Sequence, residues 1–158
     1  MEVEFDHHAV LLVEDNPDDA LLMESAWKAA RIRNRLPVVS DGEQALAYLN
    51  GTGVYADRYL YPFPISVFLD LKLPRIDGLE VLEAIRTNPM LRHLHVDVLS
   101  ASARAADVEK AIGLGANSYI VKPSRVEELV EMLSAWRTLA RFKLYVVPPT
   151  PAVAETRD

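Results

Sequence analysis

The 158-residue sequence predicts an α/β fold in which five parallel strands form one doubly wound sheet with helices on both faces. Three observations favour this fold class. Short apolar runs alternate with longer amphipathic stretches, as in chains built from βαβ units. Half of the residues are apolar and a quarter are charged, which is typical of a globular domain with a sizeable core. The length suits one ordinary domain.

Five short apolar runs are the predicted strands. An amphipathic stretch follows each of them closely. Pro37, in the second run, indicates a strand start or an edge strand, because proline has no amide hydrogen to donate to a neighbour. The predicted strands are 9–13 (AVLLV), 36–40 (LPVVS), 65–70 (ISVFLD), 95–100 (HVDVLS) and 118–121 (SYIV).

A helix is predicted after each strand. Asn16 can cap the first helix, and Pro17 suits its first position. Asp18 and Asp19 then fall in the first turn, where the helix dipole favours negative charge. The other four helices are expected at 41–50, 78–88, 105–114 and from 124 to about 145.

Two segments do not fit this alternation. The connection 51–64 (GTGVYADRYLYPFP) is longer than most connections within a domain, which indicates either a functional loop or an insertion. The segment 146–158 contains three prolines and has a polar end, so we expect it to be extended or disordered. The expected organisation is therefore one domain over 1–145, followed by a Pro-rich tail over 146–158.

Charge and composition exclude several classes of function. Lys and Arg number 17 against 23 Asp and Glu, a net charge of −6, so no general attraction to nucleic acid or to an anionic membrane is expected. The absence of cysteine excludes a disulfide framework, a thiolate metal site and a cysteine nucleophile. No apolar run reaches the length of a membrane span, and the first residues lack a secretory signal, so we expect a cytoplasmic protein.

Polar side chains stand at the predicted carboxyl ends of the strands, where open parallel sheets bind ligands. Carboxylates brought together there repel one another unless a cation lies between them, and an all-oxygen site suits Mg²⁺. A serine and a lysine at the same edge suit phosphoryl oxygens, so a carboxylate here is a candidate nucleophile toward phosphorus. The residues are Glu14 and Asp15 after the first strand, Asp70 after the third, Ser100 at the end of the fourth and Lys122 after the fifth.

These residues and the motifs around them resemble the receiver domain of two-component response regulators. The similarity extends from about Val10 to Trp136, which is most of the chain. It implies a flavodoxin-like receiver fold of five βα units with an extended C-terminal helix. The motifs that carry it, in order along the chain, are LLVEDN, LDLKLPRIDG, LSAS and GANSYIVKP.

The resemblance implies a role for each acidic residue of the site. Asp70 would accept a phosphoryl group from a histidine kinase. Asp15 and Asp70, with the backbone carbonyl of Lys72, would bind Mg²⁺ directly, and Glu14 would help through water. The chain would then be a phosphoacceptor and not an enzyme that acts on other molecules.

The resemblance also implies how the signal leaves the site. Ser100 would hydrogen-bond the phosphoryl group, and Lys122 would pair with it. Tyr119 would change rotamer as Ser100 moves, which would carry the signal to the face formed by the fourth helix, the fifth strand and the fifth helix. Ser102 would bear on the lifetime of the aspartyl phosphate. The peptide bond before Pro123 would be cis.

Three further features resemble those of the stand-alone response regulators that are paired with bacterial and cyanobacterial phytochrome kinases. They are the long connection 51–64, the motif SDGEQALAYL at 40–49 and the motif FKLYVVPP at 142–149. This likeness implies a light-responsive histidine kinase as phosphodonor and a homodimer built with the C-terminal helix and tail. An apolar stripe in the last helix is mostly core packing, but it extends past the length that a receiver needs and could serve a second copy. The stripe consists of Leu129, Leu133, Trp136 and Ala140, widened by Val126, Val130 and Leu144.

Other functions fit the residues less well. A receiver-like module that binds partners without phosphate stays an open alternative, although none of the expected site residues is missing. A haloacid-dehalogenase-type phosphohydrolase needs a second Asp two residues after its nucleophile, where this chain has Lys72. A transcription factor is disfavoured by the net charge and the lack of a basic helix. A histidine metal site is disfavoured because the neighbours His7 and His8 point to opposite sides of an extended chain.

One residue departs from the family pattern. Asp97 interrupts the fourth strand at a position where the family generally has an aliphatic residue. It shares a strand face with His95, two residues earlier, so the two side chains can form a local pair. The departure concerns the packing of this strand and not the phosphoacceptor site.

Overall fold

The computed structural model describes residues 5–143 of the chain, with side chains described as far as residue 141. The predicted end of the last helix near residue 145, Leu144 and the division at 145/146 all lie outside the described residues. The elements are β1 (Ala9–Val13), α2 (Pro17–Ala29), β2 (Val38–Val39), α3 (Gly42–Asn50), η1 (Gly53–Ala56), β3 (Pro64–Leu69), α4 (Gly78–Thr87), β4 (His95–Ser100), α5 (Ala105–Gly113), β5 (Ser118–Val121) and α6 (Val126–Lys143).

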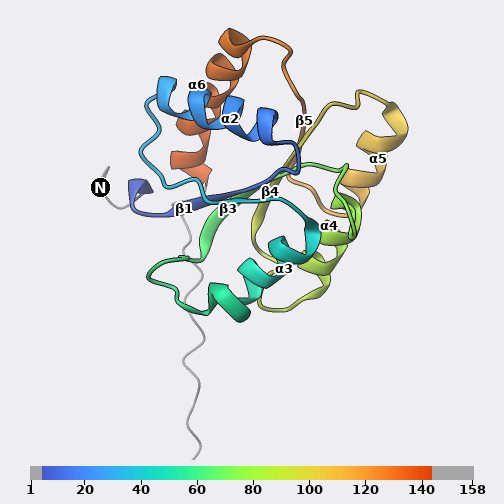
Figure 1. The fold of residues 1–158 in the computed structure, drawn as a ribbon. Helices are drawn as coiled ribbons and strands as arrows, with labels where there is room; N and C mark the ends of the chain where they lie inside the picture. Colours follow the sequence, from blue (N-terminus) through green and yellow to red (C-terminus); the bar gives the residue numbers. More distant parts are fainter. Residues whose placement is uncertain (1–4, 144–158) are drawn as a thin grey trace, which may run out of the picture.

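The strands form one parallel sheet in the order β2-β1-β3-β4-β5. Figure 1 shows α2 and α6 on one face of this sheet and α3, α4 and α5 on the other. The chain thus winds in one direction from β1 to β2 and in the other from β3 to β5. The predicted doubly wound, five-stranded fold is confirmed.

The second strand is shorter than predicted. Only Val38 and Val39 have strand geometry, where the sequence predicted 36–40. This strand lies at the edge of the sheet, and Pro37 has no amide hydrogen for pairing. The carbonyls of Arg35 and Pro37 nevertheless accept hydrogen bonds from β1, both at 2.9 Å, so the segment follows β1 without being a regular strand.

The apolar residues divide into two cores, one on each face of the sheet. Beneath α2 and α6, the rings of Trp27 and Phe68 pack on Trp136 with centroids 5.4 and 5.2 Å away. The predicted cap of α2 is present as well, since the Asn16 side chain accepts hydrogen bonds from the Asp18 amide (2.9 Å) and the Asp19 amide (3.2 Å). The stripe of α6 lies against the sheet, where Leu129, Leu133, Trp136 and Ala140 are buried.

The connection 51–64 is folded against the end of α3. Arg58 donates to the carbonyls of Tyr48 (2.7 Å) and Leu49 (2.9 Å), which belong to the last turn of that helix. The rings of Tyr55 and Tyr61 pack on each other and on Tyr48, with centroid distances between 5.1 and 6.1 Å. The connection is therefore folded, and its Tyr55 and Tyr61 extend the apolar core on this face of the sheet.

Asp97 and His95 form the pair that their shared strand face allows, with Nε2 of the histidine 3.0 Å from Oδ1 of the aspartate. Asp97 is 3% exposed and points toward α6 and not toward the phosphoacceptor edge. None of the helices within the described part of the chain has the length and apolar character that a bilayer span requires.

Candidate functional site

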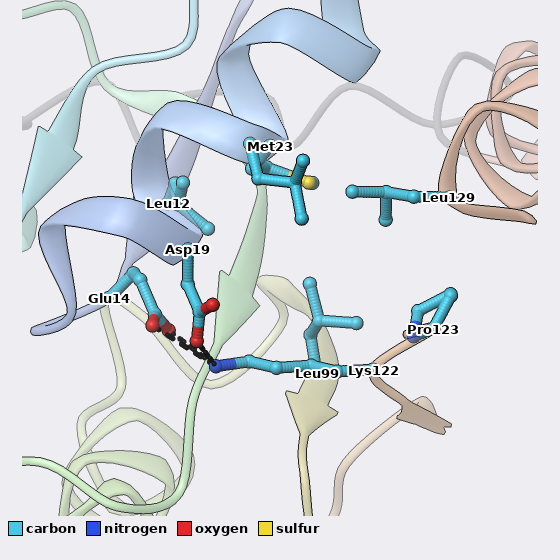
Figure 2. A pocket seen from close by; sticks show the side chains of 9 residues that line it. Leu12, Glu14, Asp19, Met23, Leu99, Lys122, Pro123 and Leu129 are labelled. Atoms are coloured by element: carbon cyan, nitrogen blue, oxygen red, sulfur yellow. Dashed lines mark hydrogen bonds and ion pairs between the residues drawn. The ribbon is translucent and has the colours of Figure 1, made fainter. Parts of the chain in front are cut away.

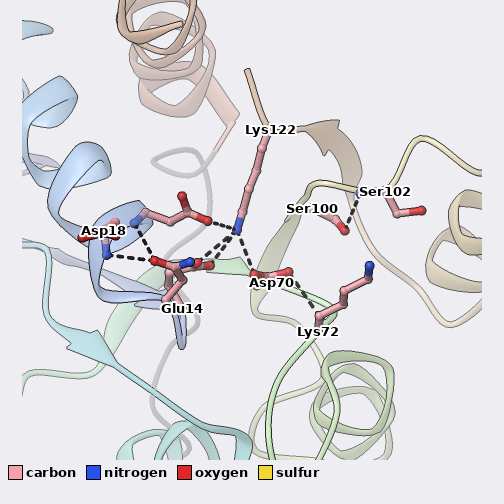
Figure 3. Close-up of polar contacts among 9 residues, drawn as sticks. Glu14, Asp18, Asp70, Lys72, Ser100, Ser102 and Lys122 are labelled. Atoms are coloured by element: carbon pink, nitrogen blue, oxygen red, sulfur yellow. Dashed lines mark hydrogen bonds and ion pairs between the residues drawn. The ribbon is translucent and has the colours of Figure 1, made fainter. Parts of the chain in front are cut away.

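The sheet order places a crevice at the carboxyl ends of β1 and β3, between which the direction of winding changes. Glu14 follows β1 directly, Asp70 follows β3, and Lys122 follows β5. Figure 3 shows these three side chains meeting at this edge, with Ser100 of β4 beside Asp70. The strand ends therefore bring together the residues that the sequence predicted for the site.

Lys122 is the centre of this group. Its Nζ donates to Oδ2 of Asp70 at 2.9 Å and to both carboxylate oxygens of Glu14 at 3.0 Å. A third carboxylate, that of Asp19, accepts from the same Nζ at 3.1 Å. One ammonium group thus serves three carboxylates, so negative charge at this edge exceeds positive charge.

The sequence analysis assigned Asp19 only to the first turn of a helix. The structure adds the contact with Lys122, because the first turn of α2 starts at the same edge of the sheet as Glu14 and Asp70. The signal was present in the sequence, since four carboxylates lie between residues 14 and 19. Two of them, Asp18 and Asp19, also suit the helix dipole, so the pattern alone does not reveal the second role of Asp19.

Burial decides the electrostatics of the two central carboxylates. Glu14 is 4% exposed and Asp70 is 6% exposed, whereas Asp15 is on the surface. Burial, the hydrogen bond with Asp70 and the charge of Asp70 together raise the pKa of Glu14 to about 8, against the opposing effect of Lys122. Burial alone would lower the pKa of Lys122, but its bonds to Asp70 and Glu14 outweigh burial and raise it.

The carboxylates of Glu14, Asp15 and Asp70 can hold a metal ion. Each offers one oxygen, and these three oxygens lie within 4.8 Å of one another. Hard oxygen ligands of this kind fit a divalent cation such as Mg²⁺, which needs few protein ligands and keeps several waters. The backbone amide of Lys72 donates to Oδ1 of Asp70 at 3.2 Å, which places the Lys72 residue directly beside this group.

The end of β4 and the loop after it form the other side of the site. The Ser102 amide donates to Oγ of Ser100 at 3.2 Å, and the Tyr119 hydroxyl donates to the Ser102 carbonyl at 2.7 Å. The structure thus joins Ser100 and Tyr119 through Ser102, although the two predicted switch residues lie on different strands. The Lys122–Pro123 peptide bond is trans, so the prediction of a cis bond was wrong; trans is the lower-energy form of X–Pro bonds in general.

A small cavity of about 50 Å³ lies between Lys122 and the helices α2 and α6. Figure 2 shows Glu14, Asp19 and Lys122 at one side of this cavity and apolar side chains at the other. The apolar side keeps water away from the Lys122 stem, which strengthens the ion pairs at its head. The apolar residues are Leu12, Leu22, Met23, Leu99, Pro123 and Leu129.

The chain was compared with known proteins. The family model of the response regulator receiver domain matches residues 10–134. The response regulator Rcp1 of Synechocystis is 36% identical over 124 residues, which cover 78% of this chain and 82% of Rcp1. The structure of Rcp1 in its Mn²⁺-bound form superposes with a TM-score of 0.73 and 34% identity, covering 89% of this chain and 97% of that one.

Two further solved structures are similar. A response regulator in red light signalling of R. palustris has a TM-score of 0.81 and 38% identity, covering 90% of this chain and 99% of that one. The phosphorylated cyanobacterial phytochrome response regulator RcpA has a TM-score of 0.77 and 33% identity, covering 91% and 99%. The resemblance inferred from the motifs, including the likeness to phytochrome response regulators, is thereby confirmed.

Proposed function

The chain belongs to the family of response regulator receiver domains, and on this premise we propose that Asp70 accepts a phosphoryl group from a histidine kinase of the phytochrome type. The observation that carries the proposal is the contact of Asp70 with Lys122 at 2.9 Å, inside a buried group of carboxylates at the switch point of the sheet. The family match and the likeness to a phosphorylated phytochrome response regulator support it.

The chemistry is a transfer from nitrogen to oxygen. A carboxylate oxygen of Asp70 attacks the phosphorus of a phosphohistidine, the new P–O bond forms as the P–N bond breaks, and the imidazole leaves with the electron pair. The Lys72 amide already donates to Oδ1 of Asp70 and Lys122 to Oδ2, so both oxygens of the nucleophile are held in place before the donor arrives.

A divalent cation would be held directly by Asp15, Asp70 and the backbone carbonyl of Lys72, with Glu14 helping through water. Bound there, it would supply positive charge to the phosphoryl oxygens during transfer. The oxygens of the three carboxylates are close enough for this role, and Mg²⁺ is the ion that we propose. The Mn²⁺-bound form of Rcp1 supports the proposal of a divalent cation.

Lys122 has to change partners during the reaction. In the described state its ammonium group pairs with Glu14, Asp19 and Asp70 and offsets their charge only in part. Once a cation and a phosphoryl group are bound, Lys122 would leave these carboxylates and pair with a phosphoryl oxygen. Ser100 donates its hydroxyl proton to another oxygen of the group, and Tyr119 follows the movement of Ser100 through Ser102.

The phosphorylated chain would act by binding protein partners in the cytoplasm, as a phosphoacceptor without enzymatic action on other molecules. The likeness to phytochrome regulators favours a light-responsive kinase as donor and a homodimer formed by the C-terminal helix and tail. Nucleic acid is not proposed as a partner, because the net charge of the chain is −6. A module that binds partners without phosphate is the alternative, and the next experiment decides between the two.

The test is intact-mass spectrometry after incubation with acetyl phosphate, with and without Mg²⁺. We expect a gain of one phosphoryl group that requires Mg²⁺ and is lost in Asp70→Asn. Asp15→Asn serves as a matched variant, because it should need far more Mg²⁺ while keeping Asp70 as the labelled residue. Labelling that survives in Asp70→Asn would overturn the assignment of the nucleophile, and no labelling of the unchanged chain would favour the phosphate-independent module.

The donor is tested separately. A phytochrome-type histidine kinase carrying a labelled phosphohistidine should lose its label to the chain within minutes and should not lose it to Asp70→Asn. Light scattering before and after phosphorylation measures the mass of the assembly. Truncation after Arg137 should lower this mass if the C-terminal segment forms the dimer, and an unchanged mass would remove that segment from the interface.

A further inference from the structure

Ser102 is tied to other elements through three of its groups. Its amide donates to Ser100 Oγ (3.2 Å), and its carbonyl accepts from the Tyr119 hydroxyl (2.7 Å). Its own hydroxyl donates to Oδ2 of Asp107 and accepts from the Arg104 amide (3.3 Å). One residue therefore joins β4, β5 and the first turn of α5.

Asp107 is the member of this network that the proposed function does not use. It is half-buried in the first turn of α5, a helix in which only Ala111 is buried. The residue before this helix, Arg104, makes no capping hydrogen bond with its side chain. The bond between Asp107 and Ser102 is thus the side-chain link from this end of the helix to the loop after β4.

The loop after β4 borders a cavity of about 180 Å³ beside Asp70. Leu71 and Lys72, which follow Asp70 in the chain, also line this cavity. Figure 3 shows the Ser102 hydroxyl directed away from Asp70, whereas the Ser100 hydroxyl lies on the side of Asp70. The cavity is lined by Leu71, Lys72, Asp77, Leu79, Ser100, Ser102 and Asp107.

The direction of the Ser100 proton follows from these bonds. A hydroxyl group has two lone pairs and one proton, and the Ser102 amide occupies one lone pair of Ser100 Oγ. The proton of Ser100 must therefore point away from that amide, and it is free to be donated into the site. If the Ser102 amide moved, the Ser100 hydroxyl could rotate and this preference would be lost.

We propose that Asp107 is a positioning residue for phosphoryl transfer to Asp70. By holding the Ser102 hydroxyl, its carboxylate keeps the Ser102 amide on Ser100 Oγ and so keeps the Ser100 proton directed at the incoming phosphoryl group. This inference rests on the proposed function of Asp70. It adds a residue on α5, outside the strand ends, that acts through Ser102 and Ser100.

A merely structural role of Asp107 makes a different prediction. If the carboxylate only stabilised the first turn of α5, its loss would slow phosphoryl uptake by the same factor whether or not Ser100 carried a hydroxyl. If it acts through Ser100, its loss has no further effect once that hydroxyl is gone. A double-mutant cycle between Asp107 and Ser100 therefore separates the two roles.

The experiment measures the rate of phosphoryl uptake from acetyl phosphate with saturating Mg²⁺, by intact mass. Asp107→Ala should slow uptake about five- to tenfold, the effect of one lost hydrogen bond that orients a donor. Asp107→Asn keeps an acceptor for the Ser102 hydroxyl and should stay within about twofold of the unchanged chain. Glu109→Ala, which removes an exposed carboxylate from the same helix, is the matched control for charge and should leave the rate unchanged.

The decisive variant combines Ser100→Ala with Asp107→Ala. It should be no slower than Ser100→Ala alone. An additional slowing in the double variant, or an uptake rate in Asp107→Ala equal to that of the unchanged chain, would overturn the positioning role and leave the assignment of Asp70 intact. An unchanged chain that takes up no phosphoryl group would overturn both. If Asp107→Ala does not fold, Ser102→Ala replaces it in the cycle, because it breaks the same contact by removing the hydroxyl that Asp107 holds.

Discussion

Two regions of the sheet bury carboxylates to the same degree, yet their surroundings differ. Asp97, beneath α6, is 3% exposed and accepts hydrogen bonds from Trp136 (3.1 Å) and Ser118 (2.5 Å), in addition to its bond with His95. Glu14, at the carboxyl edge, is 4% exposed and shares the single ammonium of Lys122 with two other carboxylates. The Asp97 carboxylate thus has three hydrogen-bond partners of its own, whereas the three carboxylates at the edge share one positive charge.

The pKa shifts of the two acids have opposite signs. Burial alone would raise the pKa of Asp97, but the hydrogen bond and charge of His95, with the bonds from Ser118 and Trp136, lower it. At Glu14, burial and the neighbouring Asp70 raise the pKa to about 8. Burial raises the pKa of both acids, and the donors around each carboxylate decide whether that effect is outweighed, as at Asp97, or not, as at Glu14. The edge carboxylates can therefore bind a cation, whereas the hydrogen bonds of Asp97 are already satisfied by protein groups.

The largest expected effect concerns the Asp97 cluster, formed by Asp97 and its partners His95, Ser118 and Trp136. Asp97→Ala removes the acceptor of three donors and leaves the buried Trp136 indole without its partner, so it should lower the free energy of unfolding by about 3 kcal/mol. Urea denaturation at neutral pH measures the loss. The matched variant Asp97→Asn keeps one carbonyl oxygen and should lose about half as much. A loss of roughly 0.5 kcal/mol or less in the alanine variant is the range of ordinary surface changes. Such a result would contradict the comparison, because the Asp97 cluster would then contribute little to stability.

At the edge cluster of Glu14, Asp19, Asp70 and Lys122, removal of a carboxylate should raise the free energy of unfolding at high pH. The pKa of Glu14 is about 8 in the folded chain and near 4.5 otherwise, so folding favours the protonated acid. Its contribution to stability is present below pH 4.5 and is lost as the pH rises through 8. Without a divalent cation, Glu14→Gln should escape this loss and be more stable than the unchanged chain at pH 9 by about 1 kcal/mol, after allowance for solvent screening.

The measurement for Glu14 is a series of urea titrations between pH 5 and pH 9 in the presence of a chelator. Ser40→Ala, a change at an exposed position on the neighbouring strand end, controls for effects of substitution as such. Parallel profiles for Glu14→Gln and the unchanged chain would contradict the raised pKa. The charge of the Glu14 carboxylate would then be as well balanced by its partners as that of Asp97.

The fold could be predicted because local patterns and the global arrangement agree. Apolar runs of strand length alternate with amphipathic helices, and a parallel sheet is the arrangement that buries both faces of such strands. The site residues Glu14, Asp70 and Lys122 could be placed for the same reason, since each directly follows a strand. The second strand was predicted too long because β propensity at 36–40 does not show that its pairing is limited to one neighbour.

Two contacts between a helix and another element could not be predicted. The pairing of His95 with Asp97 follows from strand periodicity, but nothing local indicates that Trp136, 39 residues later, reaches the same carboxylate. Asp107 carries no sequence signal either, because an acid in the first turn of a helix is already explained by the dipole. Both contacts depend on how a helix is seated on its neighbours, which the pattern of one segment does not contain.

The smallest expected effect tests the order of donors within the Asp97 cluster. His95 has 22% of its side chain accessible, so water can replace the imidazole when it is removed. His95→Ala should therefore cost only about 0.5 kcal/mol by urea denaturation, and His7→Ala, at an exposed position before β1, should cost nothing measurable. If His95→Ala instead costs as much as Asp97→Ala, the half-buried imidazole, and not the buried indole of Trp136, supplies most of the stability of this cluster.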